Sequence, residues 1–170
     1  YGLASRHGMR PTDMELMLYF KEALAGIRYP ISLAVNPPIM GYTPKPEVMA
    51  DACNKHRQVV AVNFSHTSDG YFVKFREHLK RDIPIYVHCN GSLNKLTMGA
   101  IGVFGTEANI IPRTQRSYLD AYEKHDFARL GRLYADITRF NNFVAPWYPS
   151  VARAIKMAMR LFKLPGGEGG

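Results

Sequence analysis

The chain has 170 residues, of which 46% are hydrophobic and 21% charged, a balance typical of a folded globular domain and not of a disordered chain. Lys and Arg number 22 against 14 Asp and Glu, which gives a net charge of +8. No run of Lys and Arg is longer than two, so the charge indicates a solvated surface that attracts small anions. It does not indicate a nucleic-acid site.

No window of the sequence is apolar for long enough to span a bilayer, and no signal-peptide pattern is present. Cys53 and Cys89 are too few for a disulfide framework, and their spacing is not that of a metal site. These features predict a cytoplasmic protein without a membrane segment.

Helices and strands alternate through the first part of the chain. Strands are predicted over 29–36, 58–63, 83–88 and 99–105, and helices over 14–24, 44–55 and 70–81, with a helical turn at 93–98. Thr12 or Asp13 is the expected N-cap of the first helix, and Pro37-Pro38 is expected to close the first strand. Apolar strands separated by helices predict an α/β fold with a parallel sheet.

The remainder of the chain is predicted to be helical, over 111–124, 126–140 and 151–162. Residues 165–170 begin with Pro165, contain four glycines and are predicted to be a disordered tail. No linker or second domain is indicated.

Polar residues follow each of the four predicted strands. They are Asn36, then Asn63, Ser65 and His66, then His88, Cys89 and Asn90, and then Thr106, Glu107 and Asn109. Each set alone can simply mark where a strand ends. Because the carboxyl ends of parallel strands share one edge and bind ligands there, the four sets together predict a site.

Several chemistries fit these side chains. His66, His88, Cys89 and Glu107 are zinc-ligand types, but no tight ligand spacing is present, so neither a metal nor a cofactor is predicted. A His–Glu acid–base pair needs only hydrogen-bonding geometry. A Ser65–His66 nucleophile pair is disfavoured, because adjacent strand residues point to opposite faces.

Five segments are similar to motifs of a known family. Residues 30–37, PISLAVNP, match a fifth-strand pattern P-I-x-L-Y-N-x-P, and residues 59–65, VVAVNFS, match a sixth-strand pattern V-x-G-I-K-D-S. Residues 99–112 match the more specific G-A-x-G-x-I-S-x-x-A-N-x-x-P, and 125–130 and 154–158 match segments of the closing helices. From residue 10 to 164 the chain resembles the dihydrodipicolinate synthase / N-acetylneuraminate lyase family.

This resemblance implies a (β/α)8 TIM barrel that acts on a small keto acid or sugar acid through a lysine Schiff base. Residues 1–164 would be the C-terminal part of one barrel domain, with strands five to eight, in a homo-oligomer (dimer or tetramer). Because four strands leave two open edges and the sequence starts at Tyr1, we expect part of a longer chain or a piece completed by another polypeptide. The aromatic segment 143–148 would be a subunit contact or a plug over the barrel.

The chain differs from the family at the two positions that carry the family's catalytic lysine and tyrosine. The Schiff-base lysine aligns with Asn63, with no lysine between Lys55 and Lys74, and the proton-relay tyrosine aligns with Ala34. An amide cannot condense with a ketone and a methyl group has no proton to transfer, so imine catalysis is not expected.

Two hypotheses follow from these departures. The first is a divergent lyase or aldolase; its candidate catalytic groups are Asn63, His66, His88 and Glu107, and its candidate substrate-binding residues are Ala34, Asn36, Ser65, Asn90, Phe104 and Thr106. The second is a ligand-binding or partner subunit that keeps the fold without catalysis. A third hypothesis is binding to nucleic acid through the net positive charge, but no patch of interleaved aromatic and basic residues supports it.

Overall fold

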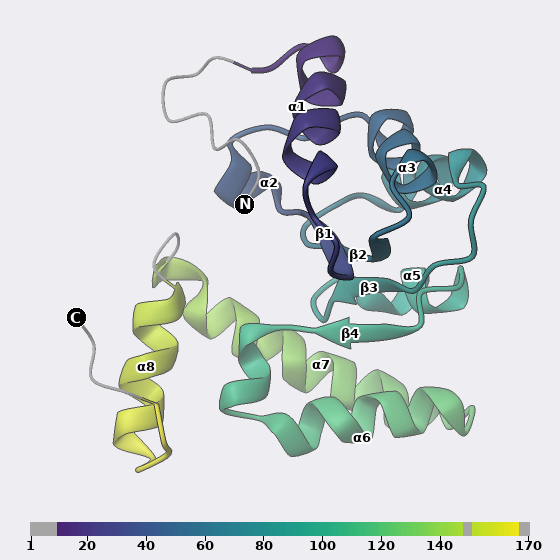
Figure 1. The fold of residues 1–170 in the computed structure, drawn as a ribbon. Coiled ribbons are helices and arrows are strands. Elements are labelled where there is room, and N and C mark those ends of the chain that lie inside the picture. Colours follow the sequence, from purple (N-terminus) through teal and green to yellow (C-terminus); the bar gives the residue numbers. More distant parts are fainter. Residues whose placement is uncertain (1–9, 148–150, 167–170) are drawn as a thin grey trace. The chain divides into compact units, whose positions relative to one another are not determined.

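The computed structural model describes residues 10–147 and 151–166, which divide into two compact units with the boundary after Gly102 (Figure 1). The first unit contains alternating helices and strands, and the second is helical. Within the described residues, no helix is both long and apolar enough to cross a membrane.

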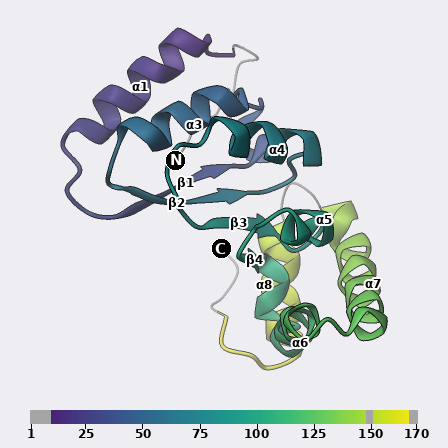
Figure 2. The same ribbon diagram turned by 90° about the vertical axis from the view of Figure 1, so that its right-hand side faces the viewer.

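In the first unit, each strand is followed by a helix, as the sequence predicts. The elements in order are α1 (Asp13–Ala25), β1 (Ile31–Val35), α2 (Pro37–Met40), α3 (Pro46–Lys55), β2 (Val59–Phe64), α4 (Asp69–His78), β3 (Ile85–His88) and α5 (Ser92–Thr97). The sheet order is β1-β2-β3-β4, where β4 is Gly102–Phe104. Helices α1, α3 and α4 all lie on the same side of β1 and β2 (Figure 2).

Strand register divides the sheet residues between two faces. β2 pairs in parallel with both β1 and β3, and this pairing sets Val35 opposite Phe64 and Phe64 opposite Val87. All three of these side chains are buried. Because side chains alternate along a strand, the residues just before them form a row on the other face. That row consists of Ala34, Asn63 and Tyr86, and it is more exposed than the first.

Phe64 is the centre of an aromatic cluster between β2 and α4. Its ring meets those of Phe75, Tyr71 and Phe72 edge-on, with centroid separations of 4.8, 5.5 and 6.4 Å. Edge-to-face contacts at these distances are favourable beyond the area that they bury. This cluster fixes α4 against the strand whose carboxyl end carries Asn63 and His66.

Two predicted elements are shorter in the structure, and one correctly predicted strand end also begins a helix. β4 has three residues in place of 99–105, because Gly99 adopts a left-handed φ of 101° and Ala100 N–H donates to Lys95 O at 2.8 Å, which ends α5. Pro37-Pro38 close β1, but they also open the short helix α2, where proline suits the first turn. α4 ends at His78, three residues before the predicted Arg81.

The second unit contains the 3-10 helix η1 (Thr106–Asn109), α6 (Pro112–Glu123), α7 (Phe127–Val144), η2 (Ala145–Trp147) and α8 (Val151–Leu161). This confirms the three predicted helices. α6 and α7 pack as a hairpin in which the rings of Tyr118 and Tyr134 stack 5.8 Å apart. Residues 167–170 of the predicted disordered tail lie outside the described residues.

Candidate functional site

The two positions that set this chain apart from the family are neighbours in the structure. Ala34 on β1 is the register partner of Asn63 on β2, and both belong to the row on the more exposed face. A methyl group and an amide therefore stand side by side where the resemblance places a tyrosine and a lysine. Neither group is a nucleophile or an acid under ordinary conditions.

Tyr86 extends this row and was missed by sequence reasoning. It is the partner of Asn63 on β3 and is 38% exposed. A Cβ added at Gly102 would lie 3.3 Å from two carbons of the Tyr86 ring, so the glycine makes room for the ring. The row thus has a phenol beside Asn63, on the side away from Ala34. The sequence does not reveal the register between β2 and β3, and without that register Tyr86 resembles any other strand residue.

A cavity of about 420 Å³ lies at the carboxyl ends of β2 and β3. Its walls bring together three predicted site residues, His66, His88 and Asn90, with six others that the sequence did not single out. Those six are Phe64, Thr67, Ser68, Val87, Gly91 and Lys95. The sequence predicted that polar groups from four successive strands come together at this edge. In this cavity, polar groups from two of them, β2 and β3, do so.

The two histidines of the cavity are stacked on one another. Their ring centroids are 4.8 Å apart with 29° between the planes, and His66 adopts a left-handed φ of 55°, which is uncommon for a residue other than glycine. The backbone N–H of Asn90 donates to Nδ1 of His88 at 3.3 Å. Because Nδ1 accepts this bond, the neutral His88 ring carries its proton on Nε2.

Lys95 on α5 is the buried charge of the cavity. Its side chain is 7% exposed, and its Nζ donates to Asp69 Oδ1 at 2.9 Å and to Gly91 O at 3.2 Å. Asn94 Nδ2 donates to Asp69 Oδ2 at 2.7 Å. Both hydrogen bonds lower the pKa of the Asp69 carboxyl group, and the bond from Asn94 has the larger effect.

Asn63 and Ala34 do not line this cavity, and neither do the two remaining candidates from the first unit, Asn36 and Ser65. Asn36 is the N-cap residue of α2, and its carbonyl accepts from Ile39 N and Met40 N at 3.0 and 2.9 Å. The Ser65 side chain is buried, and its backbone N–H donates to Val35 O at 2.8 Å. Both residues therefore have local structural roles.

Phe104, Thr106 and Glu107 belong to the second unit and follow one another across the end of β4 and η1. Glu107 is 1% exposed, and its carbonyl accepts from the N–H groups of Ile110 and Ile111 at 2.9 and 2.8 Å. The Glu107 side chain folds back over Gly105, where an added Cβ would lie 2.8 Å from Glu107 Cδ. Gly105 is thus required by the position of the buried carboxylate.

Replacing Gly105 by alanine is expected to lower the free energy of unfolding by about 1–3 kcal/mol, the usual cost of overpacking. Thermal unfolding measures this loss, and Gly131→Ala in α7, where nothing lies within 4 Å, is the matched control. In a Glu107→Ala background the Gly105→Ala change should cost much less. An equal loss in both backgrounds would show that the carboxylate is not the obstacle.

The zinc alternative finds no support among the described residues, where no three His, Cys, Asp or Glu side chains gather closely enough to hold a metal ion. Cys53 and Cys89 are buried free thiols. Burial raises the pKa of the Cys53 thiol to about 12, so at neutral pH it is protonated and a poor nucleophile.

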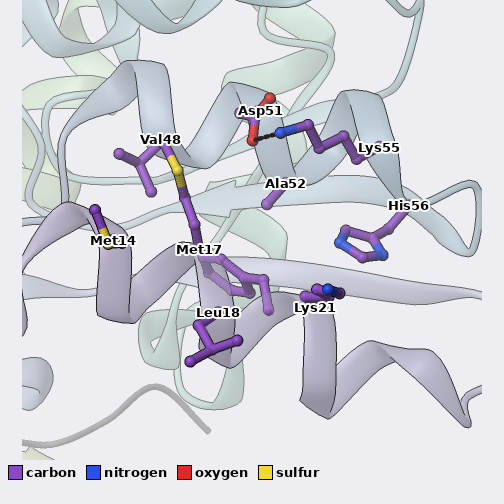
Figure 3. Close-up of a pocket in the computed structure, with 10 residues that line it drawn as sticks. Met14, Met17, Leu18, Lys21, Val48, Asp51, Ala52, Lys55 and His56 are labelled. Carbon is purple, nitrogen blue, oxygen red and sulfur yellow. Dashed lines mark ion pairs between the residues drawn. The ribbon is translucent and has the colours of Figure 1, made fainter.

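A second hollow, of about 340 Å³, lies between α1 and α3 (Figure 3). Met14, Met17 and Leu18 of α1 face Val48 of α3 across it, and an ion pair of 2.8 Å between Lys55 and Asp51 borders it. None of the predicted site residues lines this hollow.

No protein-family model matches the chain, and no curated protein does so either. Solved structures do match. A dihydrodipicolinate synthetase described as putative, from Pseudomonas aeruginosa, is 20% identical with a TM-score of 0.80, over 95% of this chain and 56% of that one. Dihydrodipicolinate synthase from Bacillus anthracis is 17% identical with a TM-score of 0.83, over 95% and 55% of the two chains.

A third match is a prophage protein of the dihydrodipicolinic acid synthase family from E. coli K12, solved in complex with pyruvate. It is 16% identical with a TM-score of 0.79, over 94% of this chain and 57% of that one. The chain therefore spans little more than half the length of the structures that it matches. The resemblance seen in the sequence is confirmed at the level of the fold: this chain has the α/β fold of the dihydrodipicolinate synthase family.

Proposed function

We propose that the chain is the strand-five-to-eight part of a divergent barrel of the lyase and aldolase type, and that it binds a small keto acid or sugar acid. The observation that carries this proposal is the pairing of Ala34 with Asn63. The two altered positions are adjacent on one face, so the changes affect a single place and leave a polar amide there. The pyruvate bound by the E. coli structure suggests the ligand class.

In this proposal the Asn63 amide orients the carbonyl or carboxylate of the acid, because an amide offers both a donor and an acceptor. His88 and His66 line the cavity at the same strand ends and are the candidates for moving protons. Glu107, Phe104 and Thr106 remain candidates from the second unit, as do Asn36 and Ser65 from the first. Chemistry of this kind proceeds without an imine at position 63.

A second candidate is a binding or partner subunit that has lost catalysis. The same Ala34–Asn63 pair favours it, because both groups that would form and protonate an imine are replaced. A turnover assay separates the two candidates: binding of an acid without turnover favours this second one, and turnover excludes it.

Self-association in the cytoplasm is part of the proposal. Phe143 and Trp147 are 74% and 52% exposed, which makes the described part of the aromatic segment 143–148 a candidate contact between copies. Light scattering on the purified protein tests it: a dimer or tetramer is expected, and a monomer at all concentrations would contradict it.

Titration calorimetry with pyruvate, 2-oxobutyrate and gluconate tests the proposed ligand class. We expect one of these acids to bind the wild type and Asn63→Leu to weaken that binding by about tenfold, the effect of losing a hydrogen bond to a charged group. Val60→Ala, which changes a 42% exposed residue of the same strand, is the control. Absence of binding by all three acids overturns the proposal.

A further inference from the structure

We propose that the Lys95 ammonium and the Thr67 hydroxyl together receive the carboxylate of the bound acid, inside the cavity at the carboxyl ends of β2 and β3. This inference rests on the proposed function and names the groups that would recognise its ligand. Neither residue follows from the sequence motifs, and both line the cavity.

The first step of the argument is the number of donors on Lys95. An ammonium group has three N–H donors, and the contacts with Asp69 and Gly91 use two of them. The side chain is 7% exposed, so bulk water does not readily serve the third. A buried ammonium group at a cavity wall, with one donor left after its contacts to described residues, is suited to an oxygen acceptor.

Thr67 is the second, independent observation. Its Oγ1 is enclosed and has no hydrogen-bond partner among the described residues. Buried hydroxyl groups are nearly always paired, so the unpaired Oγ1 of a residue that lines the cavity is suited to a ligand oxygen. A carboxylate has two oxygens and can accept from the Lys95 ammonium with one and from the Thr67 hydroxyl with the other.

The negative charge of Asp69 limits the charge of the acid that can bind beside Lys95. Both of its oxygens are held, Oδ1 by Lys95 and Oδ2 by Asn94, so one negative charge already faces the ammonium. A singly charged acid adds one more negative charge, whereas a doubly charged acid adds two and is repelled more strongly. The structure therefore assigns the cavity to small monocarboxylates such as keto acids.

A purely structural role for the ion pair predicts different behaviour. Lys95 and Asp69 join α5 to the first turn of α4, and a pair with that role alone would lower stability when either partner is replaced. Its loss would leave ligand affinity unaltered in variants that still fold. Recognition of a carboxylate predicts instead that the two replacements shift affinity in opposite directions.

The test is titration calorimetry of pyruvate with the wild type and with Lys95→Met, Thr67→Val and Asp69→Asn. Lys95→Met should weaken binding by about tenfold or more, and Thr67→Val by about threefold. Asp69→Asn keeps one acceptor oxygen and the shape of the side chain but removes the repelling charge, so it should strengthen binding by about threefold. Lys95→Arg keeps the charge and should retain measurable binding if Lys95→Met does not fold.

The outcomes separate this inference from the proposed function. If the wild type binds pyruvate and folded Lys95 and Asp69 variants bind it equally well, the inference is overturned and the proposed function stands. If Asp69→Asn weakens binding as Lys95→Met does, the Asp69 charge does not repel the ligand and the inference is again overturned. If the wild type binds no acid, both fail.

Discussion

Replacement of Phe64 by alanine is expected to lower the free energy of unfolding by about 3–5 kcal/mol, the cost of removing a large buried aromatic side chain. Phe64 is 1% exposed, and its ring contacts three aromatic rings of α4. Since small domains are stable by only about 5–15 kcal/mol, this variant should be close to unfolding. Urea denaturation followed by circular dichroism measures the effect.

Val60→Ala on the same strand is the matched control, since Val60 is 42% exposed and should lose less than about 1 kcal/mol. Phe64 also lines the cavity, so a milder Phe64→Leu variant should fold and bind acids more weakly. A loss below about 1 kcal/mol for Phe64→Ala would mean that the cluster is not the core that joins β2 to α4.

Asn63→Lys alone is expected to give no imine-dependent turnover. The substitution supplies an amine, but Ala34, its register partner, leaves the place of the proton relay empty. Because positioned acid–base groups contribute about 10²–10⁴-fold, the A34Y/N63K double variant should exceed the single variant by at least that lower factor. Turnover of pyruvate-type substrates and borohydride trapping measure the two variants in parallel.

The A34Y single variant is the control, because it adds the phenol without the amine. Imine-dependent turnover by Asn63→Lys alone would show that another group, with Tyr86 the nearest candidate in the row, already transfers the proton. In that case the loss of the relay at Ala34 would have less effect on function than the loss of the lysine.

The alternation of helices and strands and the parallel sheet were readable from the sequence. Apolar runs such as 59–62 are typical of strands in a parallel sheet, and N-cap residues such as Thr12 set the starts of helices. The same reasoning located Asn63, His66 and His88 at strand ends. Local signals were sufficient because each of these features depends on neighbouring residues.

The cavity's charge and the row beside Asn63 could not be predicted in this way. Lys95 lies between Asn94 and Leu96 in the short helix α5, and its partner Asp69 is distant in sequence, so only the packing of α5 beside α4 brings them together. Tyr86 joins Asn63 through strand register, which sequence alternation alone does not specify. The late start of β4 depended on the backbone at Gly99.

Borohydride reduction of the wild-type protein in saturating pyruvate, followed by mass spectrometry, tests most directly the claim that this fold holds its acid without an imine. The amide at Asn63 cannot condense with a ketone, and Lys95 Nζ is engaged in a hydrogen bond to Asp69 Oδ1. We therefore expect the mass of the protein to be unchanged. A pyruvate adduct reduced onto any lysine would contradict the account.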